Sequence, residues 1–578
     1  MQEPALTHPG EVILRPRFGV RLSPVHLLTG GAVLLLTYLT LVPLLFLLYG
    51  SLTSARDPGT FTFANYVRAY TDAGSFRLLA NSMVYAVGAA AISFVTGTLL
   101  AWMSERTNTP LRGLFFSLSL IPLIIPGVLF TVAWIFLLSP KIGLINVFLM
   151  WLFGLEHPPF TSYSLYAMMW VDGLHYSPLA FLLMSAAFRS MDPSLEESAL
   201  MSGAGLRQTF SRITLRLAAP AMASAFFILF VRALETFEVP ALLGLPAGIQ
   251  VFTSKIWLAT RRYPPDFGLA GAYASSLLLL TSIGVYFYSR LTRETQRFAT
   301  VTGKGFRPRV IDLGRWRYLT AAFLLLYLCL IVLLPLFVLL WNSLLPFYMP
   351  PSIEALSSLT LSNYPVAFKF PQTVRAIRNS IVLALSSAAI VMLLTSVVAW
   401  IVVKSRIRGR WLLDNLATLP VVFPGLVMGV ALMLVYLTLP VPIYGTLWIL
   451  LIAYVTRFLP YGMRACSASL VQIHRELEEA AQVSGASPGA QFRRVVLPLL
   501  TPALLAGGLY VVIVSIRELG SSVLLWGPGA EVFSVILFDL WQTGLVQEVS
   551  ALGILLTVFL FVLATTFHWV SHRYGVRR

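Results

Sequence analysis

Residues 477–486 read LEEAAQVSGA, and residues 195–204 read LEESALMSGA. The two stretches lie in different halves of the chain, and each is flanked by long apolar segments. Each stretch has two glutamates near its start and a glycine near its end. Acidic side chains are favoured in the first turn of a helix, and glycine ends helices because it adopts the left-handed conformation without a Cβ penalty. Each stretch is therefore predicted to form a short helix followed by a sharp glycine turn.

A second short helix is predicted directly after the glycine turn. In the later copy Ser487 and Pro488 follow the turn, and serine followed by proline is a common helix start. The product is a small helix–turn–helix knob with an acidic side. A single copy is equally well explained as an ordinary amphipathic connector. Two copies at equivalent places predict a docking element for a partner with two-fold symmetry.

The repeat extends over most of the chain. At a numbering offset of 298, Asn65-Tyr66 matches Asn363-Tyr364, Trp102 matches Trp400, and Pro126-Gly127 matches Pro424-Gly425. The offset then becomes 282, at which Pro178 matches Pro460, Pro220 matches Pro502 and the two knobs match each other. Each half holds six candidate spans, an even number, so the halves are predicted to share one orientation about an axis along the membrane normal. This pattern is typical of a fused pseudo-dimer with a pathway at the repeat interface.

The composition is that of a membrane protein. Of 578 residues, 57% are hydrophobic and 11% are charged, against about 25% charged in a typical soluble domain. These values exclude a cytosolic enzyme, a disordered protein and a secreted disulfide scaffold. The net charge of +17 is explained by basic loops on one side of a membrane, and no basic domain outside the loops suggests nucleic-acid binding.

The sequence predicts an all-α polytopic protein with about twelve membrane-spanning helices. A spanning helix needs about 20 mostly apolar residues. The predicted spans lie near 29–50, 81–103, 114–138, 164–188, 219–242, 269–289, 318–341, 379–403, 414–438, 444–468, 499–522 and 549–570. With both termini placed in the cytoplasm, the inner segments carry 28 Lys and Arg residues and the outer loops carry 10. This asymmetry predicts a multi-pass membrane protein with both termini cytoplasmic.

The duplicated motif resembles the EAA loop of importer-type ABC permeases. That pattern is E-A-A, three residues, G, nine residues and I-x-L-P, and the later copy matches it at Glu479-Ala480-Ala481, Gly485, Leu497 and Pro498. The first copy has Ser198 in place of the middle alanine and Arg216 in place of the proline. The architecture resembles the fused two-copy ferric-iron permeases of binding-protein-dependent systems. Thiamine permeases are similar, and polyamine permeases are more distant.

The resemblance implies how the chain is driven. Each EAA loop would form a coupling helix that enters a groove on one of two copies of a cytoplasmic ATP-binding-cassette ATPase. An extracytoplasmic substrate-binding protein would deliver the substrate, and membrane lipid would surround the spans. Glu197, Ala199 and Gly203 would contact one ATPase, and Glu479, Ala481 and Gly485 the other. We expect the neighbouring Glu196 and Glu478 to pair with basic residues of the ATPase grooves.

The chain itself is expected to be neither an enzyme nor a cofactor protein. Its Gly303-Lys304 lacks the upstream glycine of a Walker A motif, and no HExxH or CxxC metal motif occurs. ATP would therefore be used by the partner subunit, and no catalytic or metal-binding residue is assigned. An ion-gradient-driven secondary transporter is the alternative class, since it shares the twelve spans and the parallel repeat. Uptake without any ATPase would distinguish it.

Five ionisable residues inside the spans are candidates for the translocation pathway or its gate, because charges at membrane depth are costly and usually functional. They are Arg232, Glu235, Glu238, Arg517 and Glu518. Glu235 and Arg517 are equivalent under the second offset, so we expect them to meet across the repeat interface, as a gate or as a structural pair. Glu235 and Glu238 are also candidates to attract a hard cation, although we favour the simpler explanation that Glu238 lies near the outer interface and is solvated.

The predicted domains follow from the repeat. Residues 1–28 form a cytoplasmic N-terminal segment, 29–300 the first permease repeat, 301–317 a basic cytoplasmic linker and 318–578 the second repeat. The EAA loops lie near 194–216 and 476–498. The expected function is that of the permease subunit of an ATP-driven, binding-protein-dependent importer. Ferric iron is the expected substrate, with thiamine or a polyamine as alternatives.

Overall fold

The computed structural model describes residues 24–54, 60–71, 73–119, 121–191, 194–298, 310–405 and 407–573. Within these ranges the chain is helical throughout, apart from turns, loops and two isolated β-bridges. Most of the predicted segments 1–28 and 301–317 lies outside the described residues, as does the last part of the second repeat.

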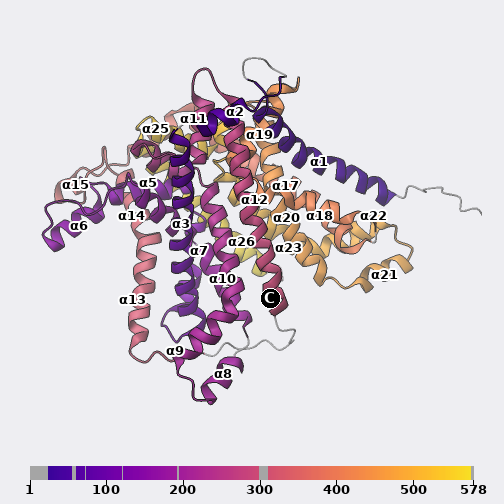
Figure 1. The fold of residues 1–578 in the computed structure, drawn as a ribbon, viewed down its shortest axis with the longest axis horizontal. Coiled ribbons are helices and arrows are strands. Elements are labelled where there is room, and N and C mark those ends of the chain that lie inside the picture. Colours follow the sequence, from indigo (N-terminus) through magenta and orange to yellow (C-terminus); the bar gives the residue numbers. More distant parts are fainter. Residues whose placement is uncertain are drawn as a thin grey trace, which may run out of the picture.

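The first half contains long helices joined by short ones (Figure 1). Its elements are α1 (Pro24–Ser51), α2 (Ala64–Thr71), α3 (Ala73–Arg106), α4 (Arg112–Leu118), η1 (Ile121–Leu123), α5 (Gly127–Leu138), α6 (Leu144–Phe153), α7 (Leu165–Ser190), α8 (Ser194–Met201), α9 (Leu206–Thr209), η2 (Phe210–Thr214), α10 (Leu215–Glu235), η3 (Pro240–Gly244), η4 (Leu245–Ala247), α11 (Phe252–Arg261) and α12 (Phe267–Phe298).

The second half follows the same plan. Its elements are α13 (Trp316–Leu328), η5 (Cys329–Leu333), α14 (Leu334–Ser343), α15 (Ile353–Ser357), α16 (Asn363–Lys369), α17 (Pro371–Lys404), α18 (Arg410–Thr418), η6 (Leu419–Val422), α19 (Gly425–Thr438), α20 (Leu447–Gln472), α21 (Arg475–Val483), α22 (Pro488–Gln491), η7 (Phe492–Val496), α23 (Leu497–Ile516), α24 (Ser522–Leu525), α25 (Phe533–Gln542) and α26 (Val546–Arg573).

The helix boundaries repeat with the offsets found in the sequence. Helices α3 and α17 have the same length, and both of their ends match under the first offset; α7 and α20 match in the same way under the second. The π-helical turns η2 and η7, at the entry to α10 and α23, also match under the second offset. A π-turn is rare and needs local support, so its presence at both places indicates the same packing in each half. The predicted duplication is thereby confirmed.

The number of spans differs from the predicted twelve. Among the described residues, eight helices are long and apolar enough to cross a membrane, or ten if each of two bent pairs counts as one span. Helices α7 and α20, which correspond to the predicted spans 164–188 and 444–468, are long enough but not apolar enough to be among them. Their interiors carry polar and charged residues such as Asp172 and Arg457. Neighbouring helices shield these two, since α7 packs along α3 and α20 packs along α17.

The third span of each half is broken at its Pro-Gly step. Residues 410–422 and 425–438 meet at an angle of 109°, and α19 begins at Gly425 directly after Pro424. In the first half α5 begins at Gly127 directly after Pro126. Proline cannot donate the backbone hydrogen bond that would continue a helix. Both third spans are therefore interrupted at these two steps.

Two of the predicted span ends are wrong, namely those at the C-terminal ends of α10 and α23. The span predicted near 219–242 ends at Glu235, where Thr236 becomes extended, and the span predicted near 499–522 ends at Ile516. The predicted loop 243–268 instead contains η4 and α11, and residues 240–247 and 252–261 form a bent pair at 80°. The chain folds back into the interior here, since Phe237 and Leu519 are both 1% exposed. Hydropathy does not distinguish the apolar residues of a segment that folds back into the protein from those at the end of a membrane span.

The first span of each half packs on the other half. Helix α1 contacts α18 and α19, while α14 contacts α5. The hydroxyls of Tyr38 and Tyr436 are 2.6 Å apart across the first contact, and the rings of Phe136 and Tyr348 stack with centroids 4.7 Å apart across the second. The halves are thus interlocked rather than side by side.

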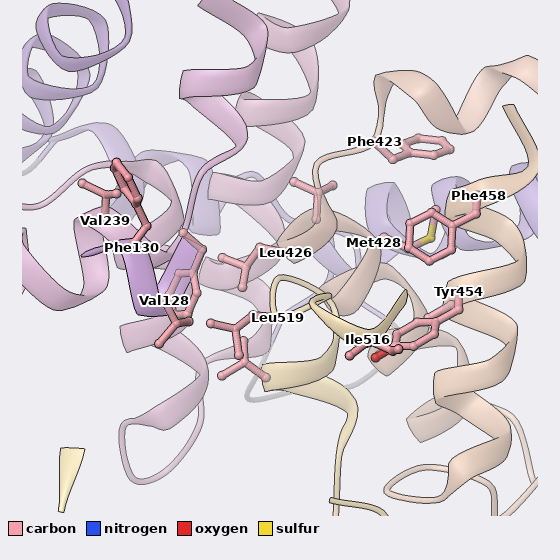
Figure 2. Close-up of a cluster of buried hydrophobic side chains, with 14 of the residues drawn as sticks. Val128, Phe130, Val239, Phe423, Leu426, Met428, Tyr454, Phe458, Ile516 and Leu519 are labelled. Atoms are coloured by element: carbon pink, nitrogen blue, oxygen red, sulfur yellow. The ribbon is translucent and has the colours of Figure 1, made fainter. Parts of the chain in front are cut away.

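Between the halves lies a buried apolar cluster (Figure 2). Val128 and Phe130 come from α5, Leu426 and Met428 from α19, and Leu519 from the segment after α23. All five are at most 1% exposed. The broken third spans and the return segments therefore form the centre of the molecule, next to the intramembrane charges.

Candidate functional site

The duplicated motif forms two matching knobs. Helix α8 ends before Gly203, whose φ is +84°, and α21 ends before Gly485, whose φ is +83°. The amide of Ala204 donates to the carbonyl of Ala199, and that of Ala486 donates to Ala481, both at 3.0 Å. This six-to-one bond with a left-handed glycine is a Schellman turn. The predicted helix and glycine turn are confirmed in both copies.

A second short helix follows each turn. Helix α22 begins at Pro488, and the hydroxyl of Ser487 accepts a hydrogen bond from the amide of Ala490 at 3.4 Å. Helix α9 occupies the equivalent place in the first half. In Figure 1, α8 lies at the lower edge and α21 at the lower right, whereas α2, α11 and α25 lie along the upper edge. Both knobs therefore project from the molecule away from α2, α11 and α25.

Each knob carries an exposed apolar side chain. Met201 and Val483 occupy equivalent positions in the last turns of α8 and α21, and each is 90% exposed. Glu197 and Glu479 are also exposed. An apolar side chain is unfavourable in water, yet one is exposed at the same place in both copies. Exposed apolar groups of this kind commonly mark protein contacts. Sequence patterns did not single out these two residues, because only the structure gives their exposure.

Glu196 points inward rather than toward a partner. Its carboxylate lies 3.3 Å from the guanidinium of Arg106, at the end of α3, and accepts the hydroxyl of Thr214 at 2.7 Å. The side chain of Arg106 is 1% exposed. We expected Glu196 to pair with a basic residue of an ATPase. Instead, its carboxylate pairs with a buried arginine of its own chain.

Glu478 makes the equivalent contact in the second half. Its carboxylate lies 3.3 Å from the ammonium of Lys404, at the end of α17, and accepts the indole N–H of Trp400 at 3.3 Å. Lys404 matches Arg106 under the first offset, and Glu478 matches Glu196 under the second. The same correction applies to Glu478. Sequence spacing alone did not pair these residues because they belong to segments with different offsets.

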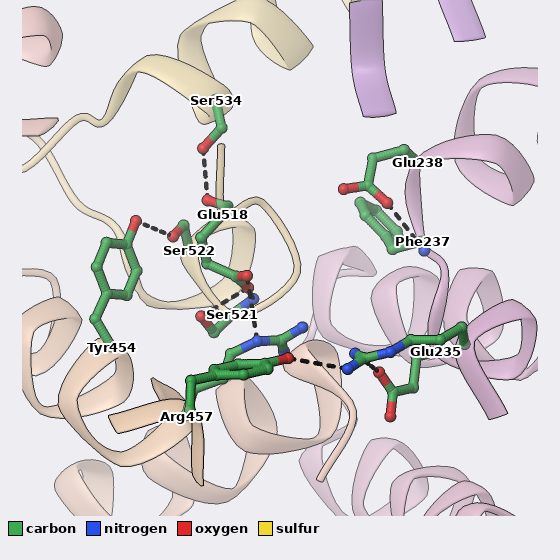
Figure 3. A network of polar contacts seen from close by, with 11 residues as sticks. Glu235, Phe237, Glu238, Tyr454, Arg457, Glu518, Ser521, Ser522 and Ser534 are labelled. Carbon is green, nitrogen blue, oxygen red and sulfur yellow. Dashed lines mark hydrogen bonds and ion pairs between the residues drawn. The ribbon is translucent and has the colours of Figure 1, made fainter. Parts of the chain in front are cut away.

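The intramembrane charges meet at the centre of the molecule (Figure 3). Arg232 on α10 lies 3.1 Å from Glu235 of the same helix, and its other terminal nitrogen donates to the hydroxyl of Tyr461 on α20 at 2.9 Å. The bond from Arg232 to Tyr461 crosses from the first half to the second. Tyr461 was not predicted as a site residue, since a tyrosine in an apolar span gives no distinctive signal.

Arg457 and Glu518 form a second ion pair beside the first. The guanidinium of Arg457 lies 3.2 Å from the carboxylate of Glu518, which also accepts the backbone and hydroxyl groups of Ser521 at 3.0 and 3.2 Å. The first turn of α19 packs against this pair, because a Cβ on Gly425 would meet Arg457 at 1.9 Å. A side chain at this position would displace the end of the Arg457 side chain.

The predicted contact between Glu235 and Arg517 is not formed. Glu235 pairs with Arg232, and Arg517 donates to the backbone carbonyl of Leu123 in the other half. Helices α10 and α23 both end at these positions. Glu238 is separate from both pairs and lies against the start of α5, where a Cβ on Gly127 would be 3.5 Å from its carboxyl carbon.

The space beside these charges is narrow. A cavity of about 10 Å³ is lined by Arg232, Glu235 and Tyr461 together with Phe423 and Arg457. This volume holds about one water molecule. No cluster of three or more His, Cys, Asp or Glu side chains suited to a metal occurs in the described part of the chain. The charged centre is thus a closely packed contact between the halves.

Comparisons with known proteins match this architecture. The model of the family "Binding-protein-dependent transport system inner membrane component" matches residues 77–296 and again 391–574, once in each repeat. The ferric transport system permease protein FbpB of Actinobacillus pleuropneumoniae is 26% identical over 89% of this chain and 74% of that protein. The Fe(3+)-transport system permease protein FbpB 2 of Haemophilus influenzae is 24% identical over 84% of this chain and 87% of that protein.

A single-repeat relative fits one half. The sulfate transport system permease protein CysT of Salmonella typhimurium is 28% identical, and the match covers 44% of this chain and 91% of that protein. Two copies of the family model in one chain agree with the two knobs and the repeated helix boundaries. The chain therefore belongs to the family of inner membrane components of binding-protein-dependent transport systems, with two copies of the family's domain fused in one polypeptide.

Proposed function

We propose that this chain is the permease through which an ATP-driven importer moves ferric iron inward across a bacterial inner membrane. The observation that carries the proposal is the pair of matching knobs, α8 and α21, each with a left-handed glycine and a bare apolar tip. Two knobs suit two identical subunits. The ATPase would lie on the cytoplasmic face with both termini of this chain, and a substrate-binding protein on the other face.

Each knob is the place where ATP-driven motion enters the permease. Glu197, Ala199 and Gly203 would meet one ATPase subunit, with Met201 as the apolar contact. Glu479, Ala481 and Gly485 would meet the other subunit, with Val483 in the same role. Glu196 and Glu478 hold the knobs to α3 and α17 through Arg106 and Lys404.

In this proposal, the charged residues at the centre of the molecule act as the gate of the translocation pathway. The hydrogen bond from Arg232 to Tyr461 and the bond from Arg517 to Leu123 both join the two halves. Breaking them would let the halves separate at the 10 Å³ cavity. The ion pairs Arg232–Glu235 and Arg457–Glu518, each within one half, would then line the opening. Their carboxylate oxygens are ligands that suit a hard cation.

Iron as the cargo is supported by the two fused relatives, which are described as ferric iron permeases. The test is uptake by cells that lack the gene, with labelled ferric iron, labelled thiamine and a labelled polyamine measured in parallel. Loss of iron uptake alone, restored by the intact gene, is the expected result. Loss of thiamine or polyamine uptake instead would keep the importer mechanism and reject iron. Uptake that persists when the ATPase is inactivated would reject the ATP-driven mechanism.

A further inference from the structure

An apolar groove lies on the first half, between α3 and α10. Its volume is about 380 Å³, and it is open along one side. Its walls include Phe94 from α3 and Leu215, Met222 and Phe226 from α10. From Leu215 to the last lining residue of α10, the groove runs along about 18 Å of helix, which is close to the thickness of one hydrocarbon leaflet.

Small residues make the hollow, and aromatic rings close one end of it. Ala219 and Ala223 leave the space at the groove's floor. The rings of Phe94 and Phe226 meet edge to face with centroids 6.1 Å apart. Phe227 stacks on Phe287 of α12 with centroids 5.3 Å apart. The inner end is thus a rigid aromatic wall, whereas the other end runs toward the start of the span.

Two arginines stand at that open end. Arg216 lies three residues before Ala219 and seven before Ala223, so all three share one face of α10. Arg212 lies about one turn earlier, in the first turns of the span Ser211–Glu235. Both arginines are exposed, and neither has an ion-pair or hydrogen-bond partner within the described ranges of the chain. Basic side chains at the end of a span lie at the level of the lipid headgroups.

The second half differs at two of the equivalent positions. Leu505 stands where the first half has Ala223, so a larger side chain occupies that place. Pro498 stands where the first half has Arg216, whereas Arg494 keeps the charge of Arg212. The small residue and the second arginine therefore occur together only in the first half. Their joint occurrence points to one ligand that uses both.

We propose that the groove holds one acyl chain of an acidic phospholipid, whose phosphate is bound by Arg216 and Arg212. The apolar lining fits a hydrocarbon chain, and the guanidinium groups fit a phosphate, which arginine contacts through two parallel hydrogen bonds. The ligand would enter from the leaflet on the side of the knobs, since α8 and α9 immediately precede η2 and α10. It would fix the start of α10 relative to α3 in one half only.

The test is retention of phosphatidylglycerol by the purified full-length protein, measured by native mass spectrometry against phosphatidylcholine at the same concentration. Arg216→Gln removes the charge, and Ala223→Leu fills the hollow with the residue found in the second half. Arg494→Gln is the matched control, because Arg494 is exposed and equivalent to Arg212 in the second half. Thermal unfolding of each variant shows that the fold is kept.

Wild-type protein is expected to retain one phosphatidylglycerol in preference to phosphatidylcholine. Arg216→Gln should lower this retention about fivefold, the effect of one basic residue near an anionic lipid surface. Ala223→Leu should lower retention of both lipids, and Arg494→Gln should leave retention unchanged. Added inorganic phosphate should not displace the lipid. Unchanged retention in both test variants would overturn the proposal, as would a loss in Arg216→Gln without any loss in Ala223→Leu.

Discussion

Arg106 at the end of α3 lies 3.3 Å from Glu196 on α8, and the side chain of this arginine is 1% exposed. This salt bridge joins a long membrane helix directly to a surface knob. Lys404 and Glu478 repeat it in the second half at the same distance. Under the proposed function, a displacement of either knob would reach α3 or α17 through these ion pairs.

The inward and outward glutamates of one knob should behave differently. Glu196→Ala leaves the buried Arg106 without its counter-charge, which costs about 3 kcal/mol. Glu197→Ala changes only an exposed side chain. We expect the first variant to lower the unfolding temperature of the purified permease, whereas the second keeps that temperature and weakens ATPase binding. Equal unfolding temperatures would contradict the role assigned to Glu196.

The bare apolar tips should contribute directly to ATPase binding. Met201→Asp and Val483→Asp each replace a side chain whose burial is worth about 1.5 kcal/mol or more, so each should weaken ATPase binding about tenfold. The measurement is the dissociation constant of the permease–ATPase complex in detergent. Ile353→Asp is the control, since Ile353 on α15 is 88% exposed but distant in the sequence from both knobs. The control losing as much affinity would rule out a specific contact.

The bond between Arg232 and Tyr461 should help to keep the centre closed. Tyr461→Phe removes one hydrogen bond across the halves, which is worth about 1 kcal/mol and corresponds to about fivefold in the open population. Tyr454→Phe is the control, because Tyr454 bonds Ser522 at 2.8 Å within the second half.

The readout for this gate is a cysteine placed at Phe423, which lines the 10 Å³ cavity and is 6% exposed. The two native cysteines, Cys329 and Cys466, are first replaced by serine. A small polar maleimide should label the Phe423 position about fivefold faster in Tyr461→Phe than in Tyr454→Phe. Equal labelling rates in the two variants would mean that the Arg232–Tyr461 bond does not restrain opening.

Charge exchanges should report which intramembrane residues are partners. Arg457 and Glu518 lie 3.2 Å apart, and exchanging them restores an ion pair with its charges reversed, so uptake should recover relative to either single change. Exchanging Glu235 and Arg517 should give no such recovery, because Glu235 pairs with Arg232 and Arg517 bonds a carbonyl. Uptake assays of the four single and two double variants decide this. Recovery in the second exchange would mean that Glu235 and Arg517 meet in another state of the cycle.

Much of the fold was predictable because the duplication leaves the same local signals twice. Gly203 and Gly485 ended their helices as expected, and the Pro-Gly steps at Pro126 and Pro424 broke the third spans. These features depend on backbone geometry that single residues determine. The return segment after Glu235 was missed, since buried apolar residues look alike whether they span a membrane or fold back into the protein.

The partners of charged residues were not predictable from the repeat. Equivalence of Glu235 and Arg517 suggested a contact, but equivalent residues meet only when both lie on the symmetry axis. The true partner of Glu196 comes from a different helix with a different offset. Side-chain direction and long-range packing determine such pairs, and neither can be predicted from the sequence pattern alone.

The most direct test of the account compares two glycine variants in a reconstituted system of permease, ATPase and binding protein. Gly485→Glu and Gly409→Glu both put a glutamate at a left-handed position, with φ of +83° and +90° and no neighbouring atom within 4 Å of the new Cβ. Their backbone strain of about 1–2 kcal/mol is the same, but only Gly485 lies on a knob. ATP-driven uptake of labelled ferric iron into liposomes should be lost in Gly485→Glu and retained in Gly409→Glu, with both proteins inserted in equal amounts. Normal uptake by Gly485→Glu would contradict the assignment of the knobs as the coupling elements.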